Sequence, residues 1–279
     1  LMETRNIDAV VADQPDNGTL RVITSDNVSI VVKRNILLDN SNNQFDGKLA
    51  DSLAQGPILS VQFTESSQVF NLLLDVLLDR EPVWHEPAPA AISDLLACLT
   101  KYGVSLDDKF SLQQQQKPFY NFVLTSAISY PLDTFALVCK YHLEDLAVEC
   151  ARRLLSIPLT QLTDEQSIDI GPVYLRRLTI LHLKHAEGLR QLLAHLPDRH
   201  EPNERCNDTS QKDNLERLWS SAVKEIWTEG EVSTISTLEF QSRLEPLANQ
   251  LHCGECQLRM RQRVQRLIVE WSTAVFAEL

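Results

Sequence analysis

One stretch, residues 20–78, constrains the fold more than any other part of the chain. It opens with two short runs rich in β-branched residues, 20–24 and 28–32. Such residues favour strands, because their side chains pack well on a pleated surface. The intervening Ser25-Asp26-Asn27 tolerates the backbone angles of a tight turn. The sequence therefore predicts a β-hairpin near the start of the folded region.

The periodicity changes after the hairpin. A helical turn is expected to open at Ile36 and to continue through Phe45 to Leu49. Residues 59–64 then alternate between apolar and polar side chains, which is typical of a strand in a sheet covered on one side. Apolar residues at helical spacing follow up to Leu78. The order strand, strand, helix, strand, helix predicts a small sheet with surrounding helices.

From residue 90 onward the pattern is nearly all helical. A stripe of leucines ends at Lys101-Tyr102-Gly103, where glycine suits a left-handed helix end. Residues 135–143 repeat this pattern, with a helix that ends in Lys140-Tyr141. The prolines between 82 and 89 predict a stiff surface connection before these helices. Two similar copies predict a local repeat of helical hairpins, too few for a solenoid.

Taken together, three segments resemble a known family: residues 28–37 with Phe45, the strand at 59–63, and the run 131–147 with its continuation to Trp271. Their order is similar to that of BTB/POZ domain proteins of the type abundant in mushroom-forming (basidiomycete) fungi. The fold class implied is α+β, a BTB/POZ-like domain with a small mixed sheet and surrounding helices, followed by an all-helical extension. The expected divisions are an N-terminal arm at 1–18, the BTB/POZ-like domain at 19–104, and the extension, BACK-like in position, at 105–279.

The resemblance implies a non-catalytic protein–protein interaction scaffold or adaptor. BTB domains commonly self-associate, so the chain itself is one expected partner, and some members dock a cullin-type ubiquitin ligase. Association of this kind needs exposed apolar side chains. Phe45, Leu49, Val69 and Leu73 are the candidates for that surface, and each of them is also an ordinary core position.

The cysteines form the one constellation with evident chemistry. Cys253 and Cys256 have the spacing that lets two thiols bind one tetrahedral metal, and Cys206 lies upstream. With His200 or His195 as the fourth ligand, they would form a structural zinc site that ties the C-terminal helix to the preceding ones. A redox pair has the same spacing, but it usually follows a strand. Two reduced thiols packed at a helix start are the third interpretation.

Charge and motifs argue against several other functions. The net charge of −12 disfavours nucleic acid and anionic membranes as partners. The chain has only eight glycines, and none forms a phosphate loop or a nucleophile elbow, so no enzymatic activity is expected. No apolar run reaches the length of a membrane helix, and the first residues lack the apolar core of a signal peptide. A cytoplasmic or nuclear location is therefore expected.

An alternative function belongs to a different class. The helical half would then carry a binding site for a small ligand or a metal. A pocket lined by Trp219, Trp227 and Trp271 would favour this alternative over the scaffold.

Overall fold

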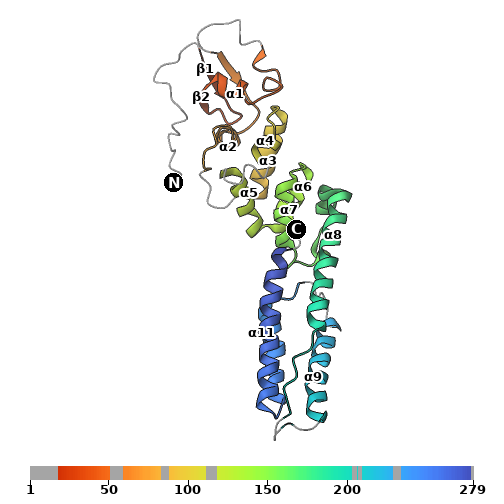
Figure 1. The fold of residues 1–279 in the computed structure, drawn as a ribbon. Helices are drawn as coiled ribbons and strands as arrows, with labels where there is room; N and C mark the ends of the chain where they lie inside the picture. The colour runs from red at the N-terminus through yellow and green to blue at the C-terminus, as the bar shows by residue number, and fades with distance from the viewer. Residues whose placement is uncertain are drawn as a thin grey trace. The chain divides into compact units, whose positions relative to one another are not determined.

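The computed structural model describes residues 18–50, 59–82, 88–110, 118–202, 206, 209–228 and 234–277. The chain divides into two compact units, Leu1–Glu149 and Cys150–Leu279 (Figure 1). This division falls later than the predicted boundary at residue 104. The first helices of the predicted extension therefore belong to the N-terminal unit. The predicted N-terminal arm up to Asn17 lies outside the described residues.

The first unit is a mixed α+β arrangement, as predicted. Its elements are β1 (Thr19–Ile23), β2 (Ser29–Lys33), α1 (Arg34–Leu38), β3 (Leu59–Gln62), α2 (Ser67–Leu77), α3 (Pro89–Lys101), α4 (Asp107–Phe110), α5 (Pro118–Ser129), α6 (Pro131–Lys140) and most of α7 (Glu144–Leu154). The strand order is β2-β1-β3, with β1 antiparallel to β2 and parallel to β3. Pro89, predicted to lie in a connection, is the first residue of α3, because proline already has a helical φ and needs no amide hydrogen there.

The predicted helix from Ile36 to Leu49 is wrong beyond Leu38. Gln44, Phe45 and Asp46 have positive φ angles between 54° and 58°, which an α-helix cannot accommodate. Polar side chains stabilise this irregular turn: the Ser41 hydroxyl accepts a hydrogen bond from the Phe45 N–H group at 3.0 Å. Side chains of the Asn-rich segment thus bond to backbone groups that would otherwise form the hydrogen bonds of a helix.

An aromatic cluster lies at the centre of the first unit. Phe45 stacks on Tyr102 with ring centroids 5.1 Å apart, and Phe63 contacts both rings and Phe70. All four side chains are buried. The Tyr102 hydroxyl donates to Glu65, whose carboxylate also pairs with Lys101 at 2.6 Å. This network fixes the end of α3 against the residues that follow β3.

The second unit is helical in its described part. Its elements after α7 are η3 (Leu159–Gln161), α8 (Asp164–Ala194), α9 (Thr209–Thr228), α10 (Thr237–Leu244), η5 (Glu245–Gln250) and α11 (Gly254–Ala277). α11 packs against α8, α9, α10 and η5, and Trp219 and Met260 are among the buried residues of the shared core. α8 bends at Gly171, whose φ is 73°, just before Pro172. Among the described helices, none combines the length and apolar character needed to cross a membrane.

Candidate metal centre

Four buried side chains of the second unit meet at one point: His200, Cys206, Cys253 and Cys256. Each offers one ligand atom, and these atoms all lie within 4.8 Å of one another. The His200 Nε2 atom is 3.2 Å from Cys256 Sγ and 3.5 Å from Cys253 Sγ, and the sulfurs of Cys206 and Cys256 are 3.8 Å apart. Around tetrahedral zinc, two sulfurs are about 3.8 Å apart and a nitrogen and a sulfur about 3.6 Å. The cluster can therefore hold a metal ion such as zinc.

The start of α11 positions two of the thiols. Cys253 immediately precedes the helix and Cys256 lies in its first turn, so the unpaired amides of that turn lie near the sulfur of Cys253. Burial alone would raise the pKa of Cys253, but the N–H groups of Cys256 and Glu255, together with the neighbouring thiols, lower it to about 7. Burial and Cys206 raise the pKa of Cys256 to about 12. A bound dication would replace these protons, because thiolates are the form that coordinates metal.

His200 is oriented by groups on the far side of its ring. Its Nδ1 atom is 2.6 Å from the backbone carbonyl oxygen of Glu201 and 3.2 Å from a carboxylate oxygen of Glu255. Both neighbours accept hydrogen bonds, so they favour a proton on Nδ1. Nε2, which faces the thiols, then carries the lone pair that a metal ligand needs.

Arginines of α11 hold the segment that carries His200. Arg263 is only 3% exposed and donates to the carbonyl oxygens of His195 and Leu192 at the end of α8. Arg266 pairs with Asp198 at 2.5 Å. A cation at the C-terminus of a helix is favourable, and here it satisfies carbonyls that would otherwise be unpaired.

The structure separates the two histidines that the sequence left as alternatives. His200 joins the three cysteines, whereas the His195 side chain is exposed and outside the cluster. Cys253 follows the 3-10 helix η5 rather than a strand, which is not the setting of a typical redox pair. All six cysteines are free thiols, and Cys98, Cys139 and Cys150 are buried in helices of the chain.

The candidates for an interaction surface lie mainly in the core. Phe45, Leu49 and Leu73 are at most 1% exposed, so they form no exposed patch on this chain, and Val69 is half-buried. Their apolar character serves the packing of the first unit. Val69 is the member of the set that retains access to a partner.

The three tryptophans proposed for a ligand pocket lie in or against one hydrophobic core. Trp219 is buried in the core and its Nε1–H group donates to the carbonyl oxygen of Leu193 at 3.0 Å. Trp227 packs against the same core, and Trp271 belongs to it and also lines a pocket together with His185. His182 and His185, both in α8, are buried.

Comparisons with models of known protein families, with curated proteins and with solved structures found no match to this chain.

Proposed function

We propose that the chain is a non-catalytic protein–protein interaction scaffold whose helical unit folds around a structural zinc ion. The observation that carries the zinc proposal is the set of four buried ligand atoms with tetrahedral spacings. Four protein ligands leave no open coordination position, which is the arrangement of structural rather than catalytic zinc sites. His200 and Cys206 would hold the segments before α9, and Cys253 and Cys256 would hold the start of α11.

Metal analysis of the purified chain tests the zinc proposal. We expect about one zinc per chain, and we expect Cys253→Ser and His200→Ala to lose most of it because each removes one of four ligands. His195→Ala is the matched control, since that side chain lies outside the cluster, and it should keep its zinc. A wild-type chain purified without chelators that contains no zinc, and takes up none on titration, would contradict the proposal.

The scaffold proposal rests on the first unit. The strand order β2-β1-β3, in an element order of strand, strand, helix, strand, helix, supports the resemblance to BTB/POZ domains on which the proposal is based. Self-association, or docking to a cullin-type ligase, would use side chains that the fold leaves accessible. Val69 in the first turn of α2 is half-buried and apolar, so it is the position at which we expect an interface to be most sensitive.

Light scattering tests self-association. We expect twice the chain mass of 31.7 kDa at micromolar concentration. Val69→Glu should shift the protein to the monomer, because burying an unpaired carboxylate in an interface costs several kcal/mol, on the order of 3 or more. Gln68→Glu adds the same charge at the neighbouring exposed position and should leave the dimer intact. If the wild type is monomeric at every concentration, or if both variants behave alike, self-association through this face is ruled out.

A further inference from the structure

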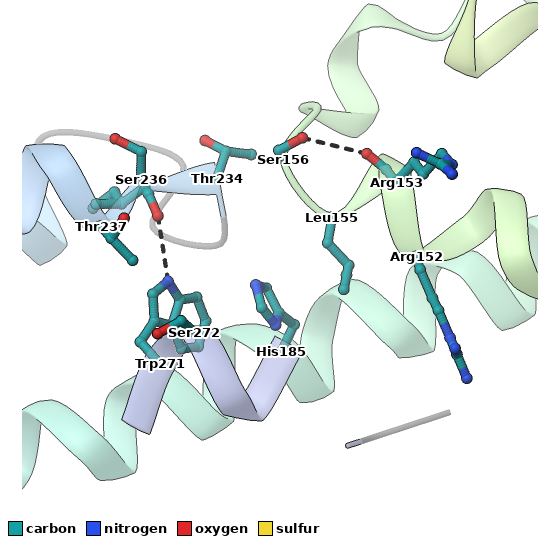
Figure 2. Close-up of a pocket in the computed structure, with 11 residues that line it drawn as sticks. Arg152, Arg153, Leu155, Ser156, His185, Thr234, Ser236, Thr237, Trp271 and Ser272 are labelled. Atoms are coloured by element: carbon teal, nitrogen blue, oxygen red, sulfur yellow. Dashed lines mark hydrogen bonds between the residues drawn. The ribbon is translucent and has the colours of Figure 1, made fainter. Parts of the chain in front are cut away.

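A pocket of about 360 Å³ lies in the helical unit, away from the cysteine cluster. The last turn of α7 and the two residues after it, His185 of α8, residues 234–237 up to the start of α10, and Trp271 and Ser272 of α11 line it (Figure 2). This volume is within the range of about 300 to 1,000 Å³ that is common for sites of small ligands. The zinc proposal gives this pocket no role.

The buried imidazole of His185 is one of the polar groups that line this pocket. The side chain is 6% exposed and stacks on Trp271, with ring centroids 4.2 Å apart. Figure 2 shows the ring between Trp271 and Leu155. No described residue hydrogen-bonds to its ring nitrogens, and neither nitrogen is among the fully enclosed polar atoms that lack a partner. The ring nitrogens therefore remain accessible to a molecule that occupies the pocket.

The charges around the pocket narrow the class of ligand. Among the described residues that line the pocket there is no carboxylate that could pair with a cation. The guanidinium groups of Arg152 and Arg153 point away from His185 in Figure 2. Burial, with a smaller effect of His182, lowers the pKa of His185 to about 4, so its ring is neutral at pH 7 and offers one donor and one acceptor. An uncharged ligand fits these surroundings best.

We propose that this pocket binds a small uncharged heteroaromatic molecule that hydrogen-bonds to His185. The rings of Trp271 and the side chain of Leu155 provide apolar surface for a planar ligand. The hydroxyl groups of Ser236 and Thr237 line the pocket and provide further polar contacts. The ligand binds without any covalent step.

Two probes of similar shape test the proposal on the full chain. Benzimidazole carries one hydrogen-bond donor and one acceptor, whereas indene has the same bicyclic outline without nitrogen. Binding is followed by the indole N–H signal of Trp271 in ¹⁵N NMR spectra, assigned with Trp271→Phe. We expect benzimidazole to bind at least about tenfold more tightly than indene, which corresponds to one hydrogen bond made to a buried partner.

Two variants distinguish binding in this pocket from nonspecific binding elsewhere on the protein. His185→Phe keeps an aromatic ring against Trp271 but removes the nitrogens. It should therefore lower the affinity for benzimidazole about tenfold and leave the affinity for indene unchanged. Thr237→Trp places a large side chain at the half-buried edge of the pocket and should abolish binding of both probes. Zinc content and circular dichroism confirm that each variant is folded, independently of ligand binding. Absence of saturable binding by the wild type, equal affinity for the two probes, or a folded His185→Phe variant with full affinity for benzimidazole would overturn the proposal.

Discussion

At the residue scale, Glu255 lies beside the ligand cluster without belonging to it. Its carboxylate is half exposed, and one oxygen lies 3.2 Å from Nδ1 of His200, the nitrogen opposite the one that faces the thiols. A carboxylate in this position raises the basicity of a ligating imidazole and fixes its orientation. The carbonyl oxygen of Glu201 also contacts Nδ1 of His200, so the imidazole ring stays oriented even without the negative charge of Glu255.

Glu255→Gln should therefore lower the affinity for zinc by about 10- to 100-fold while the protein stays folded, since the substitution removes charge and keeps the shape. Competition with a fluorescent zinc chelator measures the affinity. Glu225→Gln is the control, because it removes an exposed carboxylate of α9 that lies outside the cluster. If the two variants bind zinc equally well, the carboxylate of Glu255 has no influence on the site.

Single residues also show what the sequence could and could not predict. The spacing of Cys253 and Cys256 indicated that they share a metal ion, and Cys206 and His200 were predicted as further ligands. The structure brings these four side chains together. Glu255 and Arg263 were not assigned a role near this set. The contacts that tie these two side chains to the segment with His200 join residues more than 50 positions apart in sequence, and periodicity carries no information about such contacts.

At the scale of elements, α3 and α6 end in the same way. In α3 the Val104 N–H group donates to the carbonyl oxygen of Leu99 at 2.9 Å, and Leu143 makes the equivalent bond to Val138 in α6. The residue at the left-handed position is Gly103 in the first helix and His142 in the second. This is the Schellman arrangement, in which the chain reverses after the last turn. The sequence predicted both ends correctly, because the pattern is local.

Gly103→Ala should lower the free energy of unfolding by about 2 to 3 kcal/mol, because it adds a steric clash to the strain of a positive φ. A Cβ atom at Gly103 would lie 2.7 Å from Asn43 Oδ1, and the Asn43 amide group donates to the carbonyl oxygen of Lys101. Gly47→Ala is the matched control. Its φ is also positive, at 71°, but a Cβ atom there meets nothing within 4 Å, so only about 1 to 2 kcal/mol is expected.

Urea unfolding of the two variants measures this difference. An equal loss of stability would mean that the contact between the Asn43 side chain and α3 has no energetic role. The same contact explains why the predicted helix from Ile36 was too long. Asn42 and Asn43 bond to the end of α3, 58 or more residues away, and such tertiary bonds override local helix propensity.

At the scale of the whole molecule, the α+β class and the hairpin followed by a third strand were predictable from alternation and turn residues. The compact units of the structure divide after Glu149, later than the predicted boundary. The predicted domain boundary after residue 104 follows the helix end at Gly103, but α5 packs on α6 and α6 packs on α3, so these helices complete the first unit. Helix-on-helix packing depends on which apolar faces meet, and the sequence pattern shows only that such faces exist.

The four ligands come from two places in the chain, and α9 and α10 lie between them. A metal bound there closes a covalent loop of nearly fifty residues into a ring, much as a disulfide would, but with a link that chelators can open. If a protease cut the backbone inside that ring, the two fragments would remain bound to each other through the metal ion. They would separate only after the ion was withdrawn.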